Sequence, residues 1–192
     1  MRDIDCRILE LAKPYLNTRK NDVHTEISCK FALRLLESEP GDHEVVIPAI
    51  ICHDVGWIKV PEDLQLKAFG PKGFDPELRR IHEAEGVKLA REILRQVGYD
   101  PLKTAEIMDI IDGHDSRLTA ISANDKIVKD ADKLFRFEPV GLRIDAERFE
   151  LAILPYVKWL EERIESWFFT ETAKKLALEE LVKTPPTYSR PG

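Results

Sequence analysis

Hydrophobic residues recur at helical spacing along most of the chain, and clear strand alternation is absent. Pro155 predicts a kink or a break within the seventh of the helices that this spacing indicates. The fold class expected from the pattern is therefore all-α. The predicted helices lie near residues 3–13, 22–38, 43–54, 75–97, 101–113, 122–136, 145–169 and 171–183.

The pattern also predicts how the chain is organised. A length of 192 residues is typical of one domain, here expected to cover about residues 1–184. The ending KTPPTYSRPG cannot continue a helix, so residues 185–192 are predicted to be a tail. The longest irregular stretch, 55–74, is predicted to be a binding loop or lid, or a surface excursion with a short helix near 62–69.

Composition restricts the class of protein. With 43% hydrophobic and 33% charged residues the chain is typical of a soluble globular protein. A net charge of −6 argues against a protein whose main work is to hold nucleic-acid backbone. Neither a signal peptide nor a run of roughly eighteen apolar residues is found, so a cytoplasmic location without membrane association is expected. Three cysteines without a CxxC pair indicate neither a disulfide framework nor a thiolate zinc site.

The histidines are the first sign of chemistry. Four of the five lie on the apolar faces of four different predicted helices, whereas His43 falls in a polar turn. Each of the four could be an ordinary buried histidine, but four of them would need four separate sets of hydrogen-bond partners. Metal ions would meet that need at one place, and imidazole with carboxylate suits zinc, iron, manganese and similar divalent ions. The four are His24, His53, His82 and His114.

Asp54 follows His53 directly, where the apolar helix in AIICHDVGW ends. The two residues differ by about 100° around a helix, so both side chains can approach one ion from adjacent directions. A carboxylate can also bridge two ions, which a neutral imidazole cannot do. Four histidines with a bridging carboxylate form a set that suits two ions, and such ions typically lie roughly 3.5–4 Å apart.

These residues carry a family pattern. The order His24, His53-Asp54 and a late aspartate in VKDADKL resembles the HD superfamily of metal-dependent phosphohydrolases, whose signature is H…HD…D. With His82 and His114 the pattern resembles the binuclear branch, H…HD…H…H…D. VGW follows the HD pair where a GYP motif would stand, so cyclic di-GMP specificity is not supported.

The resemblance implies an all-α HD-domain bundle of about 7–9 helices. The metal-site core would span about residues 20–136, and cap helices would follow over about 145–184. The resemblance further implies that one ion is held by His24, His53, Asp54 and Asp132, and the other by Asp54, His82 and His114. Helical periodicity does not choose between Asp130 and Asp132. The family pattern favours Asp132, with Asp130 orienting a histidine.

Other residues are candidates for binding and catalysis. A phosphate needs fixed cationic donors, and the candidates are Lys20, Lys59, Arg79, Arg117 and Lys133. Trp57 is predicted to be a core anchor in preference to a base-stacking residue, and Glu83 and Glu85 to be exposed acids. Asp115 is either an extra ligand or proton shuttle, or simply solvated. The candidate catalytic residues are Asp54, Lys59 and Asp115.

The function implied is hydrolysis of a phosphomonoester or phosphodiester by a metal-activated water. The cofactors would be two divalent transition-metal ions, from iron, manganese, zinc, nickel and cobalt, with magnesium as an alternative. The expected partner is a small phosphoester, a nucleotide in the first place, with no membrane and no stably bound nucleic acid; a homodimer is left open. Two alternatives stay open: a di-iron oxygenase with nearly the same ligands, and a non-catalytic nucleotide-binding module.

Overall fold

The protein is described by a computed structural model over residues 1–68 and 75–183, and every regular element within these ranges is a helix. The all-α class is therefore confirmed, whereas the predicted tail 185–192 lies outside the described residues. Two short 3-10 helices are η1 (Val55–Lys59) and η2 (Phe135–Phe137). The α-helices are α1 (Asp3–Leu16), α2 (Asn21–Leu36), α3 (His43–Cys52), α4 (Glu62–Gln65), α5 (Pro76–Gln96), α6 (Pro101–Ile111), α7 (Ala123–Leu134), α8 (Pro139–Arg148), α9 (Ile153–Glu161), α10 (Ile164–Trp167) and α11 (Glu171–Val182).

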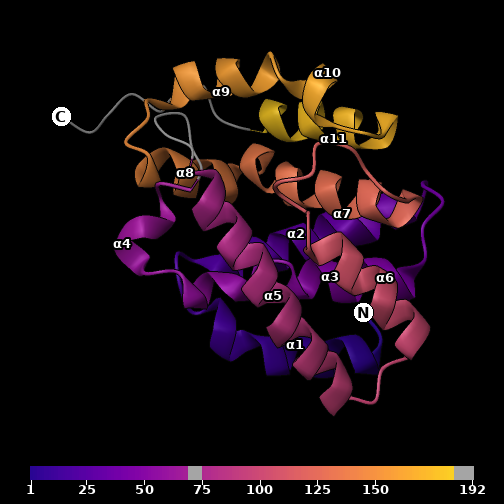
Figure 1. Cartoon of the computed structure of the whole chain (residues 1–192). Helices are drawn as coiled ribbons and strands as arrows, with labels where there is room; N and C mark the ends of the chain where they lie inside the picture. Colours follow the sequence, from indigo (N-terminus) through magenta and orange to yellow (C-terminus); the bar gives the residue numbers. More distant parts are fainter. Residues whose placement is uncertain (69–74, 184–192) are drawn as a thin grey trace.

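The helices form a body with a layer of C-terminal helices along one side (Figure 1). In the body, α2 packs on α3 and α7, and α3 also contacts α6. Helices α9, α10 and α11 form the layer at the top of Figure 1, and α11 packs on α7. Helix α7 therefore lies between the body and this layer. None of the helices in the described ranges combines the length and the apolar character that a membrane crossing needs.

Helix α3 is the centre of the hydrophobic core. The Asp42 side chain caps it by accepting a hydrogen bond from the Glu44 N–H at 2.8 Å. Residues 45–52 are all buried, because this helix is apolar on every side and other helices surround it. His53 and Asp54 come directly after it, so these two polar residues emerge in the interior of the molecule.

Three helices begin with an acidic residue followed by proline: α5 at Asp75-Pro76, α6 at Asp100-Pro101 and α8 at Glu138-Pro139. In each the acidic side chain accepts hydrogen bonds from two backbone N–H groups of the first turn. Proline stands where its missing N–H costs nothing, since the first N–H groups of a helix have no intrahelical partner. These caps set the first residue of α5, which carries His82, and of α6, which precedes His114.

The predicted helix 145–169 is wrong in its bounds, because the region is divided among α8, α9 and α10. The chain breaks before the proline: Glu150 takes a left-handed φ of 54°, and Pro155 stands in the first turn of α9. Helix α8 begins earlier than predicted. Its apolar residues Val140, Leu142, Ile144 and Ala146 alternate with other residues, so their spacing does not reveal a helix.

The predicted loop 55–74 is partly helical. Its described part, up to residue 68, contains η1 and α4, and α4 matches the short helix considered near 62–69. Residues 69–74 lie outside the described residues. Helix η1 packs closely on α5: a Cβ on Gly56 would lie 1.9 Å from the backbone oxygen of His82 and 2.5 Å from the backbone nitrogen of Gly86. Glycine at position 56 therefore permits the approach that places η1 beside His82.

Candidate metal centre

The structure brings all six predicted metal ligands together in the interior. His24 comes from α2, His82 from α5 and Asp132 from α7, whereas His53-Asp54 and His114 follow the ends of α3 and α6. Five of the six are buried, and the Asp132 side chain is only 13% exposed. With Asp115 they form three overlapping groups, each compact enough to hold an ion: His24, His53 and Asp132; His82, His114 and Asp115; and His53, Asp54 and His114, which shares a histidine with each of the other two.

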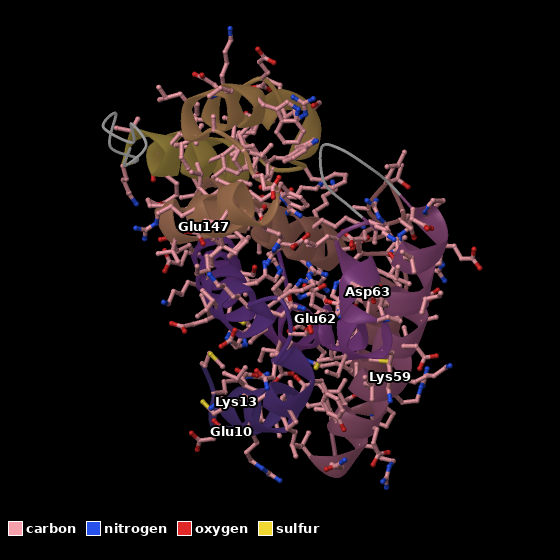
Figure 2. All side chains as sticks on the ribbon, turned by 90° about the vertical axis from the view of Figure 1, so that its left-hand side faces the viewer. Glu10, Lys13, Lys59, Glu62, Asp63 and Glu147 are labelled. Carbon is pink, nitrogen blue, oxygen red and sulfur yellow. The ribbon has the colours of Figure 1, made fainter. Side chains whose placement is uncertain are left out.

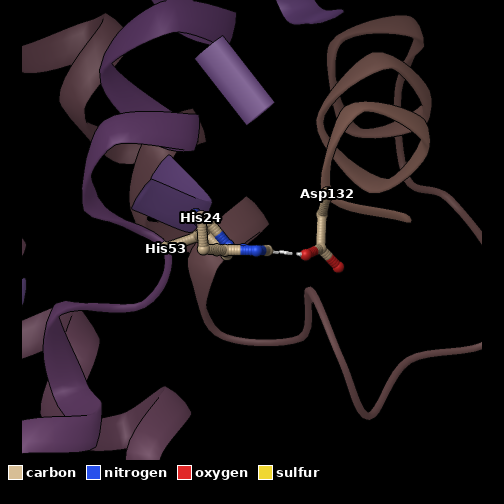
Figure 3. A group of neighbouring side chains, drawn as sticks. All are labelled: His24, His53 and Asp132. Carbon is tan, nitrogen blue, oxygen red and sulfur yellow. Dashed lines mark hydrogen bonds and ion pairs between the residues drawn. The ribbon is translucent and has the colours of Figure 1, made fainter. Parts of the chain in front are cut away.

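The first group is His24, His53 and Asp132 (Figure 3). The Nε2 atoms of the two histidines lie 3.0 Å apart. The Asp132 Oδ1 atom lies 3.1 Å from Nε2 of His24 and 3.6 Å from Nε2 of His53. Figure 3 shows Asp132 reaching from its own helix toward the two imidazoles. The structure therefore places Asp132, the aspartate that the family pattern favours, beside both histidines.

The second group is His82, His114 and Asp115. Nε2 of His82 lies 3.2 Å from Nε2 of His114, and Asp115 Oδ2 lies 3.5 Å from the former and 3.9 Å from the latter. The structure thus places Asp115 beside the ligands and not in bulk solvent, with 28% of its side chain exposed.

Asp54 lies between the two groups. Its Oδ2 atom is 3.6 Å from Nε2 of His24, and its Oδ1 atom is 3.7 Å from Nε2 of His53. The same Oδ1 atom lies 3.6 Å from Nε2 of His114 and 4.0 Å from Nε2 of His82. One carboxylate is therefore within reach of both groups, which is the placement that a bridging ligand needs.

The donor set fits metal ions. Nδ1 of His53 lies 2.7 Å from the Ile50 carbonyl oxygen, and Nδ1 of His114 lies 2.9 Å from that of Ile111. A carbonyl can only accept, so Nδ1 carries the proton in the neutral rings and Nε2 presents its lone pair to the centre. Two ligand atoms bound about 2.1 Å from one ion lie roughly 3.0–3.4 Å apart. The observed nitrogen spacings of 3.0 and 3.2 Å agree with this.

Charges at the centre shift the pKa of its members in opposite directions. Burial alone would raise the pKa values of Asp54 and Asp132, but the neighbouring histidines hold both well below their usual range. Burial lowers the pKa of His114, yet Asp54 and Asp115 outweigh it and raise the value to about 9. The pKa of His82 falls to about 4 because it is buried and lies beside His114.

Glu83 is not the exposed acid that the sequence suggested, because its residue is fully buried. Its carboxylate accepts hydrogen bonds from the backbone N–H groups of Asp115 and Ser116 and from the Ser116 hydroxyl, at 2.7–3.0 Å. On the other side, the Lys129 ammonium donates to the carbonyl oxygens of Gly113 and His114 at 2.6 and 2.7 Å. Two buried charged groups thus fix the turn that carries His114 and Asp115.

Asp130 does not orient a histidine, which corrects the role predicted for it. Its carboxylate accepts hydrogen bonds from the N–H groups of Phe169 and Thr170 and from the Thr170 hydroxyl, at 2.8–2.9 Å. Asp130 therefore attaches the start of α11 to α7. A one-dimensional pattern could not find this role, because the partner lies 40 residues away in the chain.

Trp57 is a buried anchor, as predicted, with 2% of its surface exposed. Its ring stacks on that of His82, with the ring centres 3.9 Å apart and the planes 10° from parallel. Its indole N–H donates to Asp54 Oδ1 at 2.9 Å. The side chain therefore contacts two members of the centre directly.

Only some of the predicted phosphate-binding cations lie beside the centre. Arg79, Arg117 and Lys133 line a cavity beside the centre, although the Lys133 ammonium also donates to the Trp167 carbonyl oxygen at 2.7 Å. Lys59 is exposed, and the Lys20 ammonium lies 3.6 Å from the carboxylate of the exposed Glu147 (Figure 2 labels Lys59 and Glu147). Neither lysine lines the cavity described below. The structure therefore leaves Lys20 and Lys59 outside the lining of this cavity, and the catalytic role of Lys59 stays a prediction that this placement does not support.

The cavity has two parts that meet at Arg79, Asp115, Asp132, Arg136 and Asp145. The small part, of about 70 Å³, adjoins His24 and Asp54, and its cationic lining is Arg19, Arg79, Arg136 and Arg148. The large part, of about 550 Å³, opens under the C-terminal helices. Its aromatic lining is Phe149, Tyr156, Trp159, Trp167, Phe168 and Phe169.

Sequence reasoning missed Arg19, Arg136 and Arg148. Arg136 stands four residues after Asp132 and so shares its side of the chain, which was a usable signal. Arg19 precedes α2 in a left-handed conformation with a φ of 52°, and Arg148 ends a helix whose bounds were wrong; neither position has a helical signature. Arg136 and Arg148 are held by Asp145, at 3.5 and 2.9 Å.

Comparisons with known proteins agree with this geometry. The family model of the HD domain matches residues 22–136. Among solved structures, the chain is similar to the crystal structure of a predicted HD superfamily hydrolase from an uncultured Thermotogales bacterium, with a TM-score of 0.59 and 22% identity. The similarity covers 92% of this chain and 84% of that one, and at this identity it shows a shared fold. No curated protein matches the chain.

Proposed function

The chain belongs to the HD domain family, and on that premise we propose that it is a metal-dependent phosphohydrolase acting on a phosphomonoester, in the first place a nucleotide. The observation that carries the proposal is the two-part cavity. Its small part is lined both by predicted metal ligands and by four arginines. Its large part offers space and aromatic surface for a leaving group.

The ligands of the proposed ions are the six residues already described. His24, His53, Asp54 and Asp132 would hold one divalent ion, and Asp54, His82 and His114 the other, with iron, manganese, zinc, nickel and cobalt as candidates. When bound, such a pair supplies a strongly acidified water and positive charge for the phosphate oxygens.

Arginines in the small part of the cavity would orient the phosphate. Arg19, Arg79, Arg136 and Arg148 surround a space next to Asp54 and Asp132, and guanidinium groups bind phosphate oxygens in pairs. Arg136 and Arg148 are fixed by Asp145, so they need little reordering when a phosphate binds. Asp115 lies where the two parts of the cavity meet, which is where a proton must reach the leaving oxygen.

The size of the two parts favours a monoester over a diester. Small-molecule sites have volumes of roughly 300–1,000 Å³, and the large part at about 550 Å³ falls in this class. The small part, at about 70 Å³, is too small for a second organic substituent on the phosphate. Trp159 and Trp167 in the large part present flat surface on which a nucleobase can stack.

The test is a hydrolysis screen with the full chain loaded separately with each candidate metal and with magnesium. Nucleoside 5′-monophosphates, p-nitrophenyl phosphate and bis(p-nitrophenyl) phosphate are compared by release of phosphate or nitrophenol. We expect the monoesters to be cleaved, with a loss of more than about 100-fold in Asp54→Ala, since even groups that only orient ligands cost 10–100-fold. Lys30→Ala, which removes an exposed lysine paired with Glu26, is the matched control.

Other outcomes would replace the proposal. Cleavage of the diester alone would contradict the size argument. Absence of any hydrolysis, together with an oxygen-sensitive absorption band in the iron-loaded protein, would favour the oxygenase. Binding of metal and nucleotide without turnover of either would leave a binding module.

A further inference from the structure

We propose that Trp57 is a positioning residue that fixes His82 and Asp54 together, and that the ion at His82 and His114 therefore depends on it more than the other ion does. The inference rests on the proposed two-ion site and adds a residue that is not itself a ligand. It starts from a difference among the histidines.

His82 lacks the hydrogen bond that orients its neighbours. Nδ1 of His53 and of His114 each lies within hydrogen-bond distance of a carbonyl oxygen one turn earlier. Nδ1 of His82 is buried without a hydrogen-bond partner among the residues that the structure describes. Ligand histidines ordinarily use this second nitrogen to fix the ring. The ring of His82 is instead held by the parallel indole of Trp57 at 3.9 Å.

The same indole holds Asp54. Its N–H donates to Oδ1, the oxygen that faces His82 and His114 as well as His53, at 2.9 Å. A carboxylate oxygen has a second lone pair, so this hydrogen bond leaves Oδ1 able to bind an ion. With Oδ1 fixed, Oδ2 is directed toward His24, at 3.6 Å. Trp57 thus fixes the orientation of the Asp54 carboxylate, and with it the oxygen that faces His82 and His114.

Trp57 is itself rigidly placed. Its backbone oxygen accepts a hydrogen bond from the Gln65 side-chain amide at 3.0 Å, and the Arg19 guanidinium carbon lies 4.3 Å from the ring centre. The Gln65 amide also donates to the Val60 carbonyl oxygen at 2.8 Å, which ties η1 to α4. The indole can therefore transmit a fixed orientation to both ligands.

The two ion sites should respond differently to loss of the indole. His24, His53 and Asp132 hold together through their own contacts, and His53 keeps its hydrogen bond to Ile50. His82 would lose the surface that orients it, and Asp54 the donor on the oxygen facing that site. The expected effect is loss of the ion at His82 and His114 with retention of the other.

The experiment measures metal binding without substrate in wild type, Trp57→Phe and Trp57→Leu. Phenylalanine keeps an aromatic ring against His82 and removes the N–H, whereas leucine removes both. Manganese per chain is measured by elemental analysis after dialysis at a fixed concentration, and the weaker dissociation constant by calorimetric titration. Trp159→Phe, which changes a tryptophan of the large cavity, is the matched control, and thermal melting shows that each variant is folded.

We expect two ions in wild type and Trp159→Phe. The Phe variant should bind the weaker ion about 10–100-fold less tightly, and the Leu variant should retain one ion. Two ions held with wild-type affinity in both Trp57 variants, equal loss of both ions, or fewer than two ions in wild type would each overturn the inference. If the Leu variant does not fold, the Phe variant decides. Wild type that binds two ions but cleaves no phosphoester would overturn only the proposed function.

Discussion

His82 and His114 face each other at 3.2 Å, yet their pKa values lie on opposite sides of neutrality. Asp54 and Asp115 raise the pKa of His114 to about 9, whereas burial and the neighbouring His114 lower that of His82 to about 4. In the metal-free protein at pH 7, His114 therefore carries a proton and His82 does not. A metal ion binds only the neutral ring, so this proton must leave.

Metal binding should consequently release protons. At pH 7 we expect about one proton from His114 for the ion that it binds, with a further contribution from His53, whose pKa the carboxylates of Asp54 and Asp132 raise despite its burial. Affinity should increase with pH up to about 9, where His114 is half deprotonated, and level off above it. Calorimetric titration in buffers of different ionisation enthalpy measures the number released; a heat independent of buffer would contradict the prediction.

Residue type and apolar spacing located the buried histidines, because an imidazole on an apolar face is unusual enough to stand out. Glu83 has the same kind of position, yet an acid on a charged helix looks like an exposed residue until the Asp115–Ser116 turn is seen to cover it. Arg19 gave no signal at all, because a left-handed residue before a helix follows no periodic rule. The burial and the position of such residues are determined by contacts between segments that are distant in the chain.

Among the elements, the approach of η1 to α5 determines where His82 lies relative to His53-Asp54. Gly56→Ala places a Cβ against the backbone of His82 and Gly86, so η1 must move. We expect the variant to lose about 1–3 kcal/mol of unfolding free energy, the usual cost of overpacking, and to bind metal less tightly. Urea denaturation and metal titration measure the two effects.

Gly86→Ala is the control for this prediction, since it lies on the other side of the same contact. A Cβ there would meet its nearest atoms at 3.5–3.6 Å, which is ordinary contact distance. Alanine also favours the middle of a helix over glycine by roughly 0.5–1 kcal/mol, so this variant should be as stable as wild type or slightly more so. Equal destabilisation by both substitutions would show that Gly56 does not determine how closely η1 packs on α5.

The sequence predicted most helices of the body well, because their apolar faces repeat with the helical period and their starts carry caps. It failed over the C-terminal region for a physical reason. The apolar residues of helix α8 alternate with other residues and so lack helical spacing, while the break at Glu150 depends on a left-handed residue that no motif marks. Tertiary packing determines the bounds of these helices more than the local helix preference of the sequence does.

For the molecule as a whole, α7 joins the body to the C-terminal layer. Asp132 faces the metal centre, and Asp130 and Lys133 on the same helix bind the backbone of residues 167–170. In Asp130→Ala, the buried N–H of Thr170 and that of Phe169 lose their acceptor, at about 1–3 kcal/mol for each buried group left unpaired. We expect α11 and its start to open locally while metal binding is retained.

Hydrogen exchange measured by mass spectrometry tests this, with faster exchange expected in residues 168–175 of the variant than in wild type. Lys175→Ala, an exposed change on α11, is the control and should exchange as wild type does. Unchanged exchange in Asp130→Ala would mean that other contacts suffice to hold the layer in place.

The walls of the cavity come from different stretches of the chain. The predicted ligands and the arginines near them lie between residues 19 and 148, whereas all six aromatic residues of the large part come after them, in residues 149–169. Substitutions in the later stretch can change what the large part accepts while the ligand set stays intact. For the proposed hydrolase, a new substrate can therefore arise by substitutions in one segment of the chain while the predicted metal ligands stay unchanged.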